Sequence, residues 1–194
     1  MAEFRISLPL TDADVEKLRA GDYVYLTGSV YTARDAAHKR MVETLARGET
    51  LPVDIGGQVI YYVGPTPARP GEVIGSAGPT TAERMDPFTV PLLKAGLRGA
   101  IGKGGRSPEV AAAFAAHRAV YFIAVGGAGA LLSRQIRHVE VVAYEDLGTE
   151  AMRQMEIEDF PVIVGNDIHG GDVLRLGKEQ WRRPLGGQRA NDWK

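Results

Sequence analysis

The chain contains no cysteine among its 194 residues. This absence excludes a disulfide framework, a thiolate nucleophile and any zinc or iron–sulfur centre whose cysteine ligands lie on this chain. Long apolar runs are also missing, since none approaches the ~20 residues that a membrane-spanning helix requires. The first ten residues, MAEFRISLPL, lack the basic start and apolar core of a secretory signal. We therefore expect a cytoplasmic protein that does not associate with a membrane.

Neither sign of charge dominates, because 23 Lys and Arg residues stand against 24 Asp and Glu residues. This balance gives no broad electrostatic reason to expect nucleic-acid binding. The length corresponds to about one domain, which is large enough to bury a sizeable core. Glycine, in contrast, is abundant: its 24 residues make up about 12% of the chain, against a usual value of about 7%. The glycines are clustered, which indicates local backbone turns.

Strand-like and helix-like segments alternate along the chain. Apolar stretches rich in Val, Ile and Tyr predict strands, and segments with an apolar residue at every third or fourth position predict helices. Such alternation is typical of an α/β fold, and the strand-rich first part indicates a mixed sheet with flanking helices. We expect strands at 22–31, 58–63, 72–74, 98–102, 120–125, 139–144 and 162–165, and helices at 11–20, 33–47, 86–95, 108–117 and 128–135.

The most specific local signal is the sequence GKGGRSPE at residues 102–109. A strand ends there, glycines allow a tight turn, and a helix begins at Ser107 and Pro108. Free N–H groups at a helix start attract anions, and Lys103 and Arg106 add positive charge. The segment is therefore either a carboxylate or phosphate site or an ordinary strand-to-helix turn with solvent-facing cations. It lacks the GxxxxGK[ST] pattern of a P-loop.

A second candidate is the pair Arg34 and His38, which are four residues apart on one predicted helix and so share a face. That face borders an apolar stripe formed by Ala37, Met41 and Leu45. The neighbouring guanidinium favours the neutral imidazole, which suits hydrogen bonding or a role as a base. The alternative is a pair of surface cations on a charged helix.

The segment GSAGPTTAERMD at residues 75–86 is a third candidate. Thr80 and Thr81 offer hydroxyl groups, and Arg84 offers a fork that suits a carboxylate. Long loops without secondary structure of their own are often functional, although a structural crossover loop gives the same pattern.

Two weaker signals follow further along the chain. Gly126 and Gly127 open a helix, where they provide either another anion site or close backbone packing. Asp167 and His169 lie in the predicted turn NDIHGGD, but such a pair lacks the number of ligands that a metal site needs. We predict no metal ligand on this chain.

Taken together, these segments closely resemble the C-terminal domain of class I (iron–sulfur) fumarases and the separate β-subunits of two-subunit fumarases and L(+)-tartrate dehydratases. The resemblance rests on the order and spacing of YYVGPTP, GSAGPTTAERMD, GKGGRS, VYFIAVGGAGAL, EDLGTEA and MEIEDFPVIV, and it covers about residues 8–176. It implies a swivelling β/β/α domain, which we place at residues 1–177. Residues 178–194 are polar, and this composition predicts a C-terminal tail.

The resemblance also assigns roles to individual residues. It implies that three side chains are catalytic and that seven residues bind the substrate. The catalytic residues are His38, Arg84 and Lys103, and the substrate-binding residues are Arg34, Thr80, Thr81, Gly104, Arg106, Gly126 and Gly127.

The implied function is that of the β-subunit of a hydro-lyase, fumarate hydratase, which converts malate reversibly into fumarate and water. L(+)-tartrate dehydratase, which forms oxaloacetate and water, is the alternative. The expected partners are a small dicarboxylate and an α-subunit that carries a [4Fe–4S] cluster, in a hetero-oligomer that can also self-associate. A non-catalytic module that binds an anion at the GKGG turn would be a protein of another class.

Overall fold

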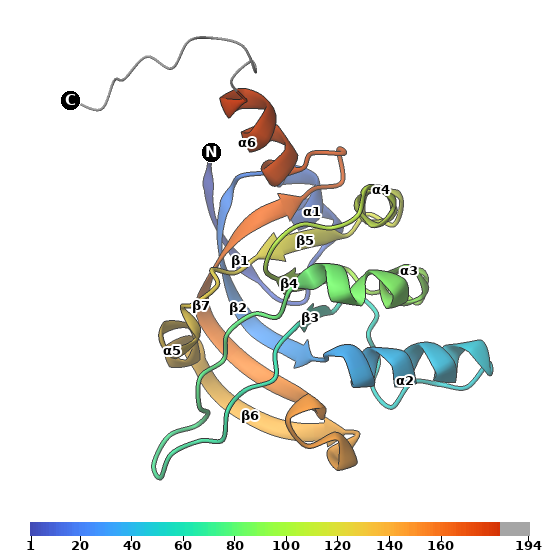
Figure 1. The fold of residues 1–194 in the computed structure, drawn as a ribbon, viewed down its shortest axis with the longest axis vertical. Coiled ribbons are helices and arrows are strands. Elements are labelled where there is room, and N and C mark those ends of the chain that lie inside the picture. Colours follow the sequence, from blue (N-terminus) through green and yellow to red (C-terminus); the bar gives the residue numbers. More distant parts are fainter. Residues whose placement is uncertain (183–194) are drawn as a thin grey trace.

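Strands and helices alternate through most of the chain, as the hydrophobic pattern predicts. The computed structural model describes residues 1–182 (Figure 1). The strands are β1 (Glu3–Ser7), β2 (Tyr23–Thr32), β3 (Val59–Tyr61), β4 (Gly99–Gly102), β5 (Val120–Ile123), β6 (Ile136–Ala143) and β7 (Met152–Asn166). The helices are α1 (Asp12–Lys17), α2 (Asp35–Ala46), α3 (Asp86–Lys94), α4 (Pro108–Ala116), α5 (Gly129–Leu132) and α6 (Val173–Trp181), with 3₁₀ turns η1 (Ala82–Met85), η2 (Ser133–Gln135) and η3 (Glu145–Glu150).

The sheet is mixed and partly closed on itself. Its seven strands follow the order β1-β2-β3-β4-β5-β7-β6. The strands from β1 to β5 are parallel to their neighbours, whereas β7 runs antiparallel to β5 and β6. Strand β7 also pairs with β2, so β2, β3, β4, β5 and β7 form a closed ring. The predicted α/β class with a mixed sheet is confirmed.

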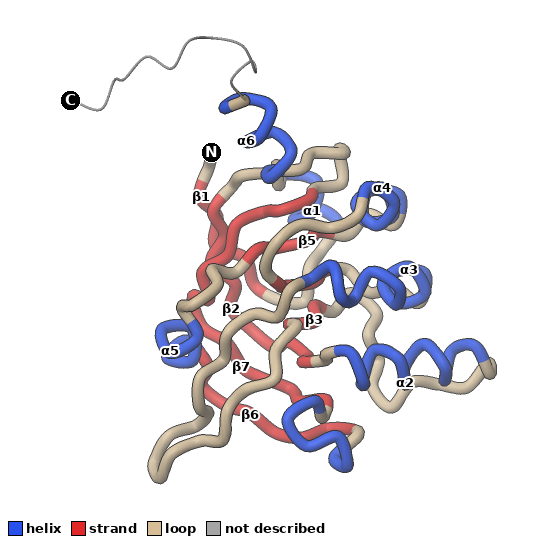
Figure 2. Tube along the Cα trace, viewed as in Figure 1, coloured by secondary structure: helices blue, strands red, loops and turns tan. Residues whose placement is uncertain are grey.

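Side-chain alternation along the strands separates two hydrophobic cores. In the segment around β3, Val59, Tyr61 and Val63 join the core inside the ring, and Ile60 and Tyr62 join the core on the outer face. This is the period of two that a strand requires. Helices α2, α3 and α4 cover the outer face and lie along one side of the strands (Figure 2).

Several helix starts form where the sequence predicts them. Thr11 caps α1 in a reciprocal arrangement with Asp14, and the Ser107 hydroxyl accepts the N–H of Val110 at the start of α4. Such caps satisfy backbone N–H groups that have no partner within the helix. Pro91 lies inside α3, which nevertheless continues to Lys94.

Some predicted elements differ in type or extent from those of the structure. Residues 72–74 form no strand and belong to the long loop between β3 and η1. Strand β7 runs over 15 residues, whereas the apolar pattern predicts only 162–165. The proposed domain end at residue 177 falls inside α6, and residues 183–194 of the proposed tail lie outside the described residues.

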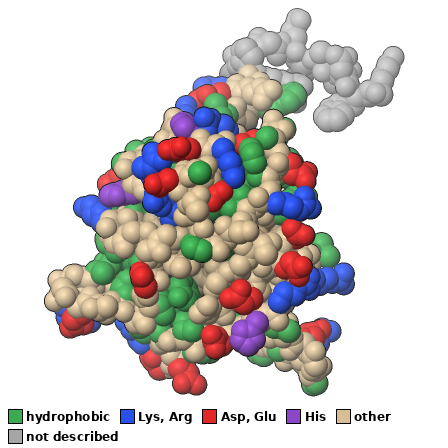
Figure 3. All heavy atoms as spheres, turned by 180° about the vertical axis from the view of Figure 1, so that it is seen from behind, with side chains coloured by type: hydrophobic (Ala, Val, Ile, Leu, Met, Phe, Trp, Pro, Cys, Tyr) green, Lys and Arg blue, Asp and Glu red, His purple; other side chains and the backbone are tan. Residues whose placement is uncertain are grey.

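The surface carries charges of both signs close to one another. On the face opposite to that of Figure 1, Lys and Arg side chains alternate with Asp and Glu side chains (Figure 3). Within residues 1–182, none of the helices combines the length and the apolar character needed to cross a lipid bilayer.

Candidate active site

The predicted site residues follow the carboxyl ends of parallel strands. Because β2, β3, β4 and β5 are parallel, their carboxyl ends meet at one edge of the sheet. Arg34 follows β2, the loop with Thr80 and Thr81 follows β3, Lys103 follows β4 and Gly126 follows β5. Ligands of α/β proteins bind outside this edge. The topology therefore gathers segments that are far apart in the sequence.

Backbone contacts join the three glycine-rich turns. The N–H of Ala77 donates to the oxygen of Gly129 over 3.1 Å, which ties the 75–78 turn to the 126–129 turn. The N–H of Lys103 donates to the oxygen of Thr80 over 3.0 Å. A Cβ atom at Gly126 would lie 3.3 Å from Cδ of Lys103, so the lysine side chain passes along this glycine. The three glycine-rich turns are thus in direct contact with one another.

The GKGG turn presents its lysine to solvent. Lys103 and Gly104 are exposed, and Thr81 is exposed beside them. Gly104 has a φ of 75°, which a residue with a side chain rarely adopts, and the Tyr121 hydroxyl donates to its oxygen over 2.8 Å. Gly127 has a φ of 82° in the neighbouring turn. This part of the edge therefore combines a cation, a hydroxyl group and accessible backbone groups.

Arg84 already has a carboxylate partner within the chain. Its Nε and Nη2 atoms donate to Oδ1 and Oδ2 of Asp35 over 3.0 and 2.9 Å. The Arg84 side chain is 51% exposed, so the rest of its guanidinium remains accessible. Asp35, the first residue of α2, is not among the predicted site residues.

Arg34 lies directly before α2 in a partly buried position. Its Nη2 is 3.6 Å from Oε1 of Glu150 in η3, and Oε2 of Glu150 accepts the N–H of Ala36 over 2.9 Å. A Cβ atom at Gly64 would lie only 2.6 Å from Nη1 of Arg34, so the glycine of YYVGPTP makes room for the guanidinium. Glu150 and Gly64 therefore lie against Arg34, and neither is among the predicted site residues.

His38 lies beneath the site and not on the surface. Its side chain is fully buried, and Nδ1 donates to the backbone oxygen of Arg34 over 2.9 Å. The ring of Tyr62 is edge-on at 5.1 Å, and Nε2 has no hydrogen-bond partner among the described residues. Burial lowers the pKa of His38 from 6.5 to about 4, and the charge of Arg106 adds to this effect. His38 is therefore neutral near pH 7, and the interpretation as a surface cation pair is wrong.

Arg106 also lies in the interior. Its Nε is 2.6 Å from Oδ1 of Asp86, and its Nη1 donates to the Tyr62 hydroxyl over 3.1 Å. Its guanidinium lies close to the rings of Phe114 and Tyr121, at 5.3 and 5.2 Å from their centroids. The guanidinium therefore fastens the GKGG turn to the outer core and is not a solvent-facing cation. A direct contact of Arg106 with the substrate stays a prediction.

The described residues do not fit an iron–sulfur cluster. The chain has no cysteine, and residues 1–182 contain no group of three His, Asp or Glu side chains that could hold a metal ion.

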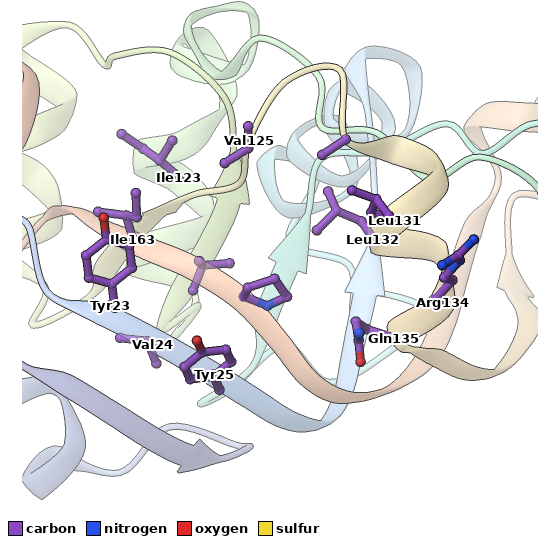
Figure 4. A pocket seen from close by; sticks show the side chains of 13 residues that line it. Tyr23, Val24, Tyr25, Ile123, Val125, Leu131, Leu132, Arg134, Gln135 and Ile163 are labelled. Atoms are coloured by element: carbon purple, nitrogen blue, oxygen red, sulfur yellow. The ribbon is translucent and has the colours of Figure 1, made fainter.

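An apolar groove lies next to the 126–129 turn and extends to Val125, the residue before Gly126 (Figure 4). It encloses about 340 Å³ between β2, β5, β7 and α5. None of the predicted site residues lines it. The lining residues are Tyr23, Val24, Tyr25, Ile123, Val125, Ala128, Leu131, Leu132, Arg134, Gln135, Pro161, Val162 and Ile163.

The fold and the site define an α/β domain whose parallel strands end in a polar, cation-bearing edge. Residues 2–176 match the family described as Fumarase C-terminus, and the chain belongs to this family. The family resemblance found in the sequence is thereby confirmed.

Relatives of two lengths share this domain. The chain is 39% identical over 170 residues to a protein of Methanocaldococcus jannaschii assigned as the β-subunit of an L(+)-tartrate dehydratase. This match covers 84% of this chain and 87% of the relative. It is 42% identical over 153 residues to the anaerobic class I fumarate hydratase of Escherichia coli K12, and 41% identical over 152 residues to the mitochondrial fumarate hydratase 1 of Leishmania major. Each match covers 77% of this chain but only 28% of the fumarate hydratase. The homologues are hydro-lyases, and the family implies an iron–sulfur enzyme.

Proposed function

We propose that the chain is the β-subunit of an iron–sulfur hydro-lyase, fumarate hydratase, and that it supplies carboxylate-binding residues to a site shared with an α-subunit. The observation that carries the proposal is the edge where Arg34, Arg84 and Lys103 follow three separate strands of a domain of the fumarase family. Malate and fumarate are dicarboxylates, and two carboxylates require several cations and N–H donors.

The cations have a chemical task beyond binding. Removal of a proton next to a carboxylate places negative charge on that carboxylate in the transition state, and preorganised donors stabilise this charge. Arg84 and Lys103 supply donors on the accessible side of the edge, and Arg34 adds positive potential. We assign His38 a supporting role, because its neutral ring holds the backbone oxygen of Arg34 at the start of α2.

The remaining chemistry falls to the partner. A [4Fe–4S] cluster held by the α-subunit would supply the Lewis acid for the substrate hydroxyl. The lack of cysteine in this chain supports that placement. We propose a hetero-oligomer that can also self-associate, located in the cytoplasm, where cysteine ligands stay reduced.

L(+)-tartrate dehydratase is the second candidate function. The Methanocaldococcus jannaschii relative favours this function, because it is assigned as a separate β-subunit and the match covers 87% of its length. L(+)-tartrate carries one more hydroxyl group than malate, so both candidates need the same carboxylate-binding edge.

An activity assay of the reconstituted complex tests the proposal. The chain is co-expressed with an α-subunit of the same family, the cluster is rebuilt without oxygen, and turnover of malate, fumarate and L(+)-tartrate is measured. We expect turnover of malate and fumarate by the complex and none by the chain alone. Preference for tartrate would select the second candidate.

Failure to convert any of the three substrates would contradict both candidates. In that case calorimetry tests whether the chain is instead a non-catalytic anion-binding module. A non-catalytic anion-binding module would bind phosphate or succinate tightly as an isolated chain, whereas the β-subunit should bind succinate weakly without its partner.

A further inference from the structure

Two carboxylates form ion pairs with two arginines at the start of α2. Asp35 receives two hydrogen bonds from Arg84 over 3.0 and 2.9 Å. Glu150 lies 3.6 Å from Arg34 and also accepts the N–H of Ala36 over 2.9 Å. Neither acid belongs to the predicted site, yet each contacts a cation that does. Their arrangement indicates what they do for those cations.

Asp35 binds one side of the Arg84 guanidinium and leaves another side unused. A guanidinium has five N–H groups in a planar fork and can accept carboxylates on two of its edges. Asp35 takes the edge formed by Nε and Nη2. The other edge, formed by Nη1 and the second N–H of Nη2, has no hydrogen-bond partner among residues 1–182. A second carboxylate can therefore bind while Asp35 stays in place.

Glu150 performs the corresponding task for Arg34. The residue before α2 is Arg34 itself, whose side chain does not cap the helix. Glu150, which lies 114 residues after Ala36 in the sequence, supplies the missing acceptor to the N–H of Ala36. The same carboxylate approaches Nη2 of Arg34, while Gly64 leaves space beside Nη1. The helix start and the arginine are thus held by one group.

The four side chains form a chain of alternating charge. Between the two pairs, Nε of Arg34 lies 3.9 Å from Oδ2 of Asp35. The exposed fractions range from 23% for Arg34 to 51% for Arg84, and ion pairs at such positions add little to stability. Asp35 fixes the direction of Arg84, because a carboxylate that accepts two parallel hydrogen bonds sets the plane of the guanidinium. Glu150 restrains Arg34 as a nearby opposite charge at 3.6 Å.

We propose that Asp35 and Glu150 are positioning residues, which aim Arg84 and Arg34 at the carboxylates of the substrate. The proposal rests on the proposed function, since it requires a dicarboxylate substrate at this edge. Both acids act through the arginines and make no contact with the substrate.

Kinetics of the reconstituted complex test this role. We expect Asp35→Ala and Glu150→Ala to raise KM for fumarate about 10- to 100-fold, because a misaligned arginine loses charge-assisted hydrogen bonds to the substrate carboxylate. Asp35→Asn, which keeps one acceptor oxygen, should recover part of the loss. The matched control is Asp146→Ala: Asp146 also lies in η3 and accepts two hydrogen bonds from Arg40 of α2, each over 2.8 Å. This control should leave KM and kcat unchanged.

The outcomes separate the alternatives. A lower KM in Asp35→Ala would overturn the proposal, because it would mean that Asp35 competes with the substrate for Arg84. Values equal to those of Asp146→Ala would overturn it as well.

A second measurement does not depend on turnover. In the full chain labelled with ¹⁵N-arginine, the Nε–H signal of Arg84 should exchange slowly in the wild type and in Asp146→Ala, and rapidly in Asp35→Ala. Slow exchange in Asp35→Ala would contradict the positioning role. An inactive wild-type complex that still shows the protected signal would refute only the proposed function.

Discussion

Burial decides the protonation state of His38. Its pKa falls from 6.5 to about 4 because the ring is fully buried. The unfolded chain binds a proton at this residue below about pH 6.5, whereas the folded chain does so only below about pH 4. The stability that this residue contributes is therefore present above pH 6.5 and is lost as the pH falls toward 4.

His38→Gln tests this linkage. Glutamine does not titrate, so we expect the variant to lose less stability than the wild type between pH 7 and pH 4.5, by up to about 3 kcal/mol. Urea unfolding at several pH values measures the difference. His138→Gln is the control, because His138 is exposed. Equal pH dependence in His38→Gln and the wild type would show that His38 is not the group responsible.

At the scale of residues, the sequence predicts which cations lie at the carboxyl edge of the sheet but not which side chains bind them within the chain. Arg34, Arg84 and Lys103 are recognisable from glycine-rich turns and from the family resemblance. The partner of Arg84 is 49 residues away, and no local pattern reveals such a pairing. Arg106 shows the same difficulty, since a turn sequence cannot indicate that a guanidinium will lie among Tyr62 and its aromatic neighbours.

At the scale of elements, helix α5 packs so closely against the 75–78 turn that its first residue, Gly129, has no room for a side chain. A Cβ atom at Gly129 would lie 2.8 Å from the nitrogen of Gly78, a contact that real Cβ atoms essentially never make. The backbone of the 75–78 turn would have to move away from α5.

Gly129→Ala should therefore destabilise the protein by about 1–3 kcal/mol, the usual cost of overpacking. The control is Gly177→Ala, because Gly177 lies in helix α6 with no atom within 4 Å of its Cβ position. The control should be neutral or stabilising by up to about 1 kcal/mol, since alanine favours a helix. Thermal unfolding of both variants measures the contrast, and an unchanged melting temperature in Gly129→Ala would refute the packing argument.

The elements that the sequence missed have physical reasons in common. Strand β1 buries only Ile6 among its five residues, so it carries a weak apolar signal at the edge of the sheet. Strand β7 contains Pro161 and three acidic residues at positions 156, 158 and 159, which obscure its alternation. Met155 and Ile157, on either side of Glu156, are nevertheless buried, because β7 pairs with β2 on one side and β6 on the other. Pairing partners distant in the sequence stabilise a strand that local propensity does not predict.

For the whole molecule, Phe160 connects the ring. It is fully buried in β7, its ring lies edge-on to Tyr61 of β3 at 5.3 Å, and its backbone pairs with Leu26 of β2. Phe160→Ala should cost about 3–5 kcal/mol of unfolding free energy.

Chemical denaturation followed by circular dichroism measures this loss. Phe4→Ala is the comparison, because Phe4 is only partly buried in the edge strand β1 and should cost less. We expect one cooperative transition in each variant, since the two cores share the same strands. Equal losses in the two variants would contradict the central role of Phe160.

The closed ring also sets the order of events during synthesis on the ribosome. Tyr23 of β2 pairs with Ile163 of β7, so 140 residues of translation separate the two halves of that seam. At about 5–20 residues per second, the first half waits on the order of ten seconds for its counterpart. During this interval the strand edge of β2 that β7 will cover is exposed to the contents of the cell. A chaperone that shields nascent strand edges would therefore have its opportunity between the emergence of β2 and that of β7.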